Sequence, residues 1–186
     1  DVGFIGALAS DLVRSHGADP GRIYLGGFSN GASMAFRAGA ELDGRVAAIG
    51  PVAGHCWLAP PPTDRPVPAL MIFGGRDPLN PPDGGEVKTP WGSVEYHPPV
   101  LESFDRWRAF NRCAGEPQTT ATDGVREFRA TGCAPDGDVR CVIVDDLGHH
   151  WPGGPRLLPP WIAGPASTRV DGARLLWDFF RAHRLG

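Results

Sequence analysis

Residues 22–42 constrain the fold more than any other part of the chain. An apolar run at 22–27 predicts a strand, residues 27–31 are G-F-S-N-G, and a helix-prone stretch follows. Strand, sharp turn and helix in this order form the context of a G-x-S-x-G nucleophile elbow, which holds a serine hydroxyl above the edge of a sheet. Glycines on both sides of Ser29 are expected to leave room where the strand and the helix nearly touch. A five-residue match also arises by chance, so its weight depends on this context.

Apolar and helical segments alternate along the rest of the chain. The sequence predicts strands at 46–53, 69–75 and 139–144, a short strand at 125–130 for which an antiparallel arrangement is one option, helices at 1–16, 29–42, 100–112 and 168–184, and irregular segments at 54–68, 78–98 and 152–166. This alternation favours a mostly parallel sheet flanked by helices. The first helix is expected to be amphipathic, with Ile5, Leu8 and Leu12 on one face. In the last helix Val170, Ala173, Trp177 and Phe180 are expected to share one face.

Composition narrows the class of protein. The 186 residues suit one domain, and 41% apolar content is ordinary for a globular protein. A net charge of −3 gives no sign of nucleic-acid binding. No apolar run is long enough to span a membrane. The chain begins at Asp1 without an initiator Met or a signal peptide, so we expect a processed product or a fragment.

Four cysteines allow three full pairings. We favour a disulfide between Cys113 and Cys133, which flank a polar, glycine- and threonine-rich segment. Cys141 lies within a strand pattern and is expected to be a buried free thiol. A disulfide would place the protein in an oxidising compartment, whereas four reduced thiols in a cytosolic protein are the alternative. The cysteines and histidines lack metal-site spacing, and we expect no metal or other cofactor.

Two residues downstream are candidate partners for Ser29. Asp77 follows the strand at 69–75, and His149 follows the strand at 139–144. Catalytic groups collect at the carboxyl ends of strands in open α/β sheets. The chain order Ser, Asp, His is that of α/β-hydrolases. Alternative acids are Asp83, Asp145 and Asp146.

Several short strings carry a resemblance to a known family. They are D-V-G-F at 1–4, G-F-S-N-G-A at 27–32, P-V-A-G at 51–54, D-P at 77–78 with D-G-G at 83–85, and, most specific, G-H-H-W-P-G-G at 148–154. The chain resembles, over essentially its whole length, secreted esterases of the polyhydroxybutyrate depolymerase and feruloyl esterase family, which are α/β-hydrolases. The family's acid turn usually has a His-Gly-Thr-like approach, where this chain has F-G-G-R at 73–76. The family's early His-Gly loop, which supplies one oxyanion-hole N–H, is absent.

The resemblance implies a single α/β-hydrolase catalytic domain over residues 1–186. Because the elbow comes so early, we expect this domain to lack its N-terminal strands. The resemblance also implies Ser29 as the nucleophile, Asp77 as the acid, His149 as the base and the backbone N–H of Asn30 as half of the oxyanion hole. Secretion or export to the periplasm would follow.

Each of these residues has a plainer interpretation. Ser29 could be a helix N-cap, and Asp77 could cap a turn before a proline. His150 is the immediate rival of His149.

Further aromatic and histidine side chains are candidates for binding substrate. We expect Phe28, His150 and Trp151 to contact it, and Trp57 and Trp91 have weaker support. An aromatic side chain there could stack on a feruloyl ring, a sugar or a polyester segment. His55 could line the site or be a polar loop residue, whereas His97 and His183 are expected at the surface.

The leading functional prediction is a serine carboxylic-ester hydrolase acting through an acyl-enzyme. Its substrate would be a small or polymeric ester: a polyhydroxyalkanoate-type polyester, or a feruloyl or acetyl ester of a polysaccharide. One alternative is a non-catalytic ligand-binding relic of the fold, and another is a peptidase of the prolyl oligopeptidase type. The sequence leaves the oligomeric state open.

Overall fold

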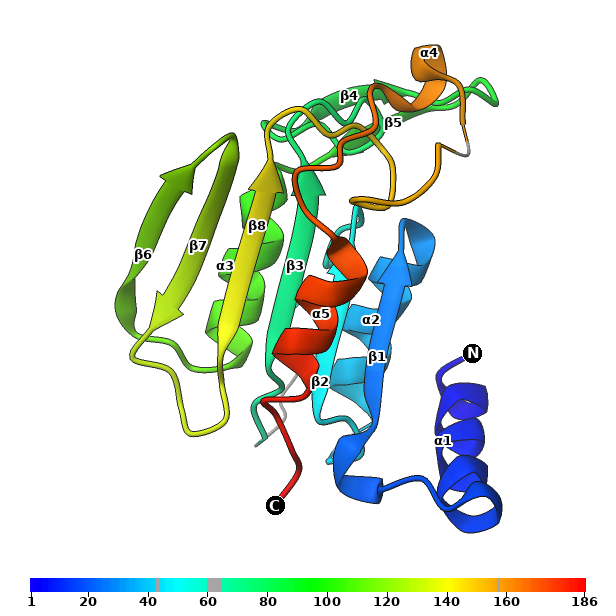
Figure 1. Cartoon of the computed structure of the whole chain (residues 1–186), viewed down its shortest axis with the longest axis vertical. Coiled ribbons are helices and arrows are strands. Elements are labelled where there is room, and N and C mark those ends of the chain that lie inside the picture. The colour runs from blue at the N-terminus through cyan, green and yellow to red at the C-terminus, as the bar shows by residue number, and fades with distance from the viewer. Residues whose placement is uncertain (43, 60–64, 157) are drawn as a thin grey trace.

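A six-stranded sheet forms the centre of the molecule (Figure 1). The computed structural model describes residues 1–42, 44–59, 65–156 and 158–186. Within them the strand order is β1 (Tyr24–Phe28), β2 (Ala48–Val52), β3 (Ala69–Gly74), β8 (Val139–Val144), β7 (Val125–Thr131), β6 (Gly115–Thr122). The first four strands run parallel, and β7 and β6 are antiparallel to their neighbours. The predicted mostly parallel α/β architecture is confirmed.

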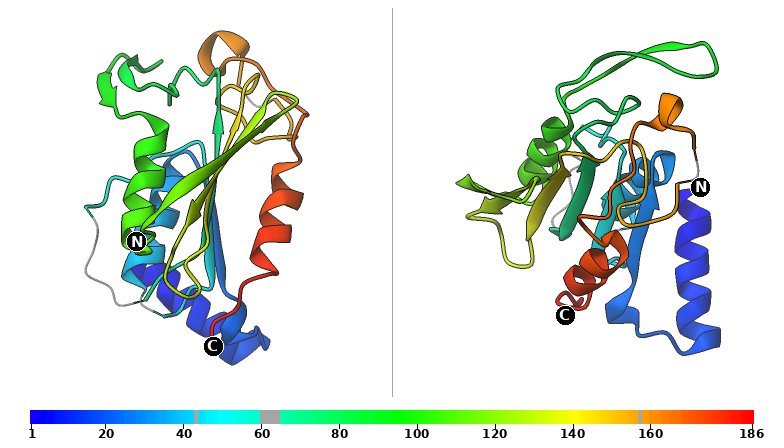
Figure 2. Two further views of the ribbon diagram at one scale, coloured as in Figure 1. Left: turned by 90° about the vertical axis from the view of Figure 1, so that its left-hand side faces the viewer. Right: turned by 45° about the horizontal axis from the view of Figure 1, so that its top comes forward.

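Helices cover both faces of this sheet. They are α1 (Val2–His16), α2 (Asn30–Glu41), α3 (Val100–Phe110), the short α4 (Pro160–Ala163) and α5 (Gly172–Phe180), with a 3₁₀ turn at Pro20–Arg22. Figure 2 shows α2 and α3 on one side of the sheet and α5 on the other. None of the helices in the described ranges is long and apolar enough to cross a membrane.

The central strands are apolar on both faces because each face packs on helices. Successive side chains of a strand point to opposite sides. In β3, Met71 and Phe73 join the cluster with Phe36 and Trp107 of α2 and α3. Ile72, between them, joins the cluster on the α5 side. This two-sided burial explains the continuous apolar runs, which are typical of covered parallel strands.

Two antiparallel pairings involve strands that the sequence did not predict. Within 78–98 the chain forms a hairpin of β4 (Gly85–Lys88) and β5 (Val94–His97), which pairs with itself and not with the central sheet. The segment between Cys113 and Cys133 contains β6, which pairs with β7 through a turn at Asp123 and Gly124. Both turn residues have positive φ, 50° and 74°, as a D-G hairpin turn requires.

The cysteine predictions are confirmed. Cys113 and Cys133 form a disulfide that joins the end of α3 to the end of β7. Cys56 and Cys141 are buried free thiols.

The apolar faces predicted for the first and last helices are covered only in part: Ile5, Val170 and Phe180 are half-buried, and the other members are exposed. In α1, Leu8 and Leu12 are 47% and 40% exposed. In α5, Leu176 and Phe179 are buried and Trp177 is 59% exposed. The last helix begins only at Gly172, after Asp171 caps it by accepting a hydrogen bond from the Arg174 N–H. Leu176 and Phe179 then face the apolar cluster over β2, β3 and β8.

Candidate active site

The turn between β1 and α2 places Ser29 in an uncommon backbone conformation. Its φ is 56° and its ψ is −119°, a region that non-glycine residues rarely adopt. The Ser29 N–H donates to the Val52 carbonyl at 2.9 Å, and the Ser29 carbonyl accepts from the Ala32 N–H at 2.9 Å. Such strain persists only where the surroundings enforce it, and it clusters at functional sites.

Glycines make this turn possible, though not both of those expected. A Cβ on Gly27 would lie 2.1 Å from the Gly31 carbonyl oxygen, and one on Gly54 would lie 2.3 Å from the Ser29 carbonyl oxygen. A Cβ on Gly31 would meet no atom of the described residues within 4 Å. Glycine is therefore required at 27, where strand and helix approach, and at 54, where the segment after β2 passes the elbow, and the expectation that Gly31 serves the same purpose is wrong.

Three polar side chains form one hydrogen-bonded chain. His149 Nδ1 lies 2.8 Å from Asp77 Oδ2, and His149 Nε2 lies 3.0 Å from Ser29 Oγ. Asp77 and His149 are almost completely buried. A proton on Nδ1 would be donated to the Asp77 side chain, and Nε2 would then be left to accept the Ser29 hydroxyl proton. The other Asp77 oxygen accepts from the backbone N–H groups of Leu79 and Asn80, both at 2.8 Å.

Neighbouring strands bring these residues together. β3 and β8 are adjacent and parallel, so their carboxyl ends meet at one edge, and Asp77 and His149 follow them. The His149 N–H donates to the Ala163 carbonyl at 2.6 Å. A Cβ on Gly74, the last residue of β3, would lie 2.3 Å from the Leu147 carbonyl oxygen. The two turns are thus packed backbone against backbone, which holds the imidazole beside the carboxylate.

The alternative acids form ion pairs with other residues or are exposed to solvent. Asp145 pairs with Arg126 and Asp146 with Arg169, each at 2.8 Å. Asp83 is exposed. Among the described acids, Asp77 is the one that lies within hydrogen-bonding distance of His149.

The three predicted substrate-binding residues are placed differently. The Phe28 ring lies 4.9 Å, centroid to centroid, from that of His149. His150 is buried, and its Nε2 lies 3.2 Å from the Gly164 carbonyl oxygen. Trp151 lines a separate hollow between β1 and α5. The residues that line the cavity at Ser29 include neither Phe28 nor His150 nor Trp151.

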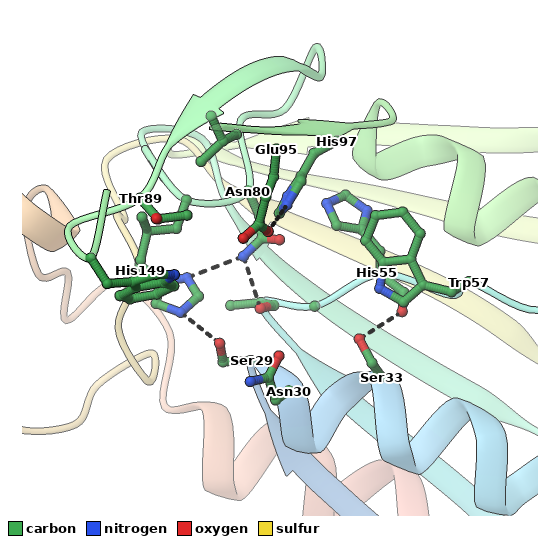
Figure 3. A pocket seen from close by; sticks show the side chains of 15 residues that line it. Ser29, Asn30, Ser33, His55, Trp57, Asn80, Thr89, Glu95, His97 and His149 are labelled. Carbon is green, nitrogen blue, oxygen red and sulfur yellow. Dashed lines mark hydrogen bonds and ion pairs between the residues drawn. The ribbon is translucent and has the colours of Figure 1, made fainter. Parts of the chain in front are cut away.

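A cavity of about 290 Å³ opens beside Ser29 (Figure 3). Trp57 and Trp91, for which the sequence offers weaker support, both line this cavity. His97 also lines it and is half-buried, whereas we expected it at the surface. Its wall is formed by the elbow, the segments after β2 and β3, the hairpin and the turn that carries His149. The residues that line it are Ser29, Asn30, Ser33, Ala53, Gly54, His55, Trp57, Leu79, Asn80, Val87, Thr89, Trp91, Glu95, His97 and His149.

Asn30 begins α2 and lies on the cavity wall next to Ser29. The N–H groups of a first helical turn have no intrahelical acceptor, and this end of a helix carries partial positive charge. The position suits a backbone donor to an oxygen that develops negative charge.

Asn80 is a site residue that the sequence interpretation missed. Its Nδ2 donates to the Ala53 carbonyl at 3.1 Å and lies 3.2 Å from His149 Nδ1. Ala53 itself has a φ of 51°. Asn80 thus ties the end of β2 to the turn that carries Asp77. The signal for it was an Asp followed three residues later by Asn, directly after a strand, where Asx turns are common.

No group of three or more His, Cys, Asp or Glu side chains in the described ranges could hold a metal ion.

Comparisons with known proteins find esterases. No protein-family model matches the chain. It is 32% identical to putative esterase NocK of Nocardia uniformis subsp. tsuyamanensis, over 96% of this chain and 56% of that protein. It is 30% identical to feruloyl esterase B of Piromyces equi, over 80% of this chain and 28% of that protein. It is 26% identical, over 77 residues, to the bifunctional acetylxylan esterase/xylanase XynS20E of Neocallimastix patriciarum, 41% of this chain and 12% of that protein.

The chain spans about half the length of the first of these relatives and less of the other two. All three proteins are named esterases, although they come from different organisms. The chain is therefore related, at modest identity, to proteins named esterases.

Proposed function

We propose that this protein is a serine carboxylic-ester hydrolase with an α/β-hydrolase fold. The observation that supports it best is the Ser29–His149–Asp77 hydrogen-bonded chain at the carboxyl ends of β1, β3 and β8. The names of the relatives support the same reaction class. A single catalytic domain over residues 1–186 is part of the proposal.

In this mechanism Ser29 Oγ attacks the ester carbonyl carbon while its proton passes to His149 Nε2. The tetrahedral oxyanion lies near the Asn30 backbone N–H. Its collapse breaks the bond to the alcohol, which leaves with the proton from His149. Water then attacks the acyl-enzyme, His149 takes the water proton, and the acid leaves as Ser29 is regenerated. Asp77 holds the imidazole tautomer and stabilises the imidazolium throughout.

The proposed substrates are polyhydroxyalkanoate-type polyesters or feruloyl and acetyl esters of polysaccharides. The cavity is at the small end of ligand pockets, so it would hold one ring or a short acyl chain, with the rest of a polymer outside. Two relatives carry feruloyl and acetylxylan in their names. The Cys113–Cys133 disulfide supports an extracellular or periplasmic location.

Labelling with a fluorophosphonate probe, followed by peptide mapping, tests the proposal. We expect one adduct, on Ser29, and turnover of p-nitrophenyl acetate that falls by on the order of 10³ or more in Ser29→Ala. Ser15→Ala, an exposed serine of α1, is the matched control and should label and turn over like the wild type. An adduct on another residue, or unchanged turnover in Ser29→Ala, would contradict the assignment.

A further inference from the structure

Three rings gather on the side of the cavity away from His149 (Figure 3). His55 and Trp57 follow β2, and His97 ends β5 of the hairpin. The ring centroids of His55 and His97 are 5.2 Å apart, those of His55 and Trp57 5.3 Å, and those of Trp57 and His97 5.6 Å. The proposed mechanism uses none of them.

The ring of His55 is buried, and its two nitrogens have no hydrogen-bond partner among the described residues. The residue is 1% exposed. The Nδ1 atom of His97 is likewise buried and unpaired. Buried polar atoms nearly always have partners, and those that do not call for an explanation. Burial, followed by the neighbouring His97, lowers the pKa of His55 to about 4, so this imidazole is neutral at pH 7.

The two imidazoles offer opposite hydrogen-bonding groups. His97 Nε2 lies 3.3 Å from Glu95 Oε2, which assigns the His97 proton to Nε2 and leaves Nδ1 as an acceptor. A neutral His55 keeps one N–H donor. A hydroxyl group both donates and accepts, so a single hydroxyl can satisfy one nitrogen of each ring. A carboxylate cannot donate a hydrogen bond to His97 and would be repelled by the Glu95 carboxylate. An ammonium group cannot accept a hydrogen bond from His55.

We propose that His55 and His97 form a subsite that binds a hydroxyl group carried on a ring of the ester substrate. The subsite shares its cavity with Ser29, so the inference rests on the proposed function. The indole of Trp57, 53% exposed, offers a flat apolar surface for that ring. Because the His55 nitrogens are out of contact with solvent, we expect this indole to shift when the hydroxyl enters.

The hydroxyl can come from two sources: a phenolic ring of the acyl group or a sugar ring of the alcohol. Two matched ligand pairs separate them. The first is methyl 4-hydroxycinnamate against methyl cinnamate, and the second is acetylated xylose against cyclohexyl acetate. Binding is measured by calorimetry to Ser29→Ala, which retains the cavity without turnover, and kcat/KM is measured with the wild type.

We expect the hydroxylated member of one pair to bind about tenfold or more tightly, since a site built around a hydroxyl discriminates against an analogue lacking it. In the Ser29→Ala background, His55→Phe should reduce that ratio to about one, and His55→Asn, which keeps a donor and an acceptor, should restore part of it. Tyr96→Phe, an exposed change on the same hairpin, is the control and should leave the ratio unchanged.

Equal binding within both pairs, or an unchanged ratio in His55→Phe, would overturn the subsite. Selective binding by a protein that hydrolyses no ester would support the subsite and contradict the proposed function. Ester hydrolysis with equal binding within both pairs would support the proposed function and contradict the subsite. Circular dichroism shows whether each variant is folded, and His97→Phe provides a second test if His55→Phe does not fold.

Discussion

Replacing each of the two glycines that flank Ser29 with alanine should have opposite effects. A Cβ at Gly27 would lie 2.1 Å from the Gly31 carbonyl oxygen, against about 3.4 Å for an ordinary contact, and 2.8 Å from the Ala32 nitrogen. These atoms belong to backbone, so no side-chain rotation relieves the clash and the start of α2 must move. A Cβ at Gly31 would have no neighbour within 4 Å in the part of the chain that the structure describes.

The expected magnitudes follow from this difference. Overpacking costs about 1–3 kcal/mol where side chains adjust, so Gly27→Ala should cost about 3 kcal/mol or more. In a domain of this size that lowers the unfolding midpoint by roughly 6–12 °C. Gly31→Ala should leave stability unchanged or raise it by up to about 1 kcal/mol, because alanine is the better helix former.

Urea unfolding and thermal melts of both variants measure these effects, and fluorophosphonate labelling reports the geometry at Ser29. We expect Gly27→Ala to lose labelling even under conditions where it is folded, since the helix start carries Asn30. Stability of Gly27→Ala within about 0.5 kcal/mol of the wild type, or equal losses in the two variants, would refute the steric argument, because ordinary surface changes fall within that limit.

Three further predictions concern other parts of the molecule. Asn80→Ala should lower stability by about 1–3 kcal/mol, because the Ala53 carbonyl loses a buried donor, and should reduce kcat more than it raises KM; equilibrium unfolding and steady-state kinetics check this. Reducing the Cys113–Cys133 disulfide, or Cys113→Ser, should cost about 3 kcal/mol for a loop of this length, and an unchanged midpoint in reductant would contradict it. Burial lowers the pKa of His55 in the folded protein to about 4, from the ordinary histidine value of 6.5, so the unfolded chain binds more protons between these values. Stability therefore falls as pH drops from 6.5 to 4, by up to about 3 kcal/mol. His55→Phe should lose less stability than the wild type between pH 7 and pH 4, and equal losses would count against this pKa.

The central strands could be predicted because burial on two faces leaves a strong apolar signal. The elements that were missed carry a weaker one. β6 is largely exposed and polar, so it lacks that pattern, although the D-G pair at 123–124 marks its hairpin turn. The prediction for α5 failed in part for a different reason. Apolar spacing shows which residues share a face, but the start of the helix and its neighbours decide which face is covered.

For the candidate site, sequence order placed Ser29, Asp77 and His149 at strand ends, and the structure brings them into contact. Their catalytic roles stay a proposal. The cavity wall was harder to foresee, since it depends on how the hairpin and the segment after β2 meet. His97 was expected at the surface but lines the cavity, whereas Trp151, within the most specific motif, faces the hollow beside α5.

The separation between the sheet and the β4–β5 hairpin has a practical consequence. The nucleophile, base and acid of the proposed mechanism each follow a strand of the central sheet, while much of the cavity wall comes from a ribbon that pairs with itself: Val87, Thr89, Trp91, Glu95 and His97. Insertions or replacements in this ribbon leave the register of the central sheet untouched. A laboratory library confined to residues 85–97 would therefore vary this part of the cavity wall while the strand ends stay constant.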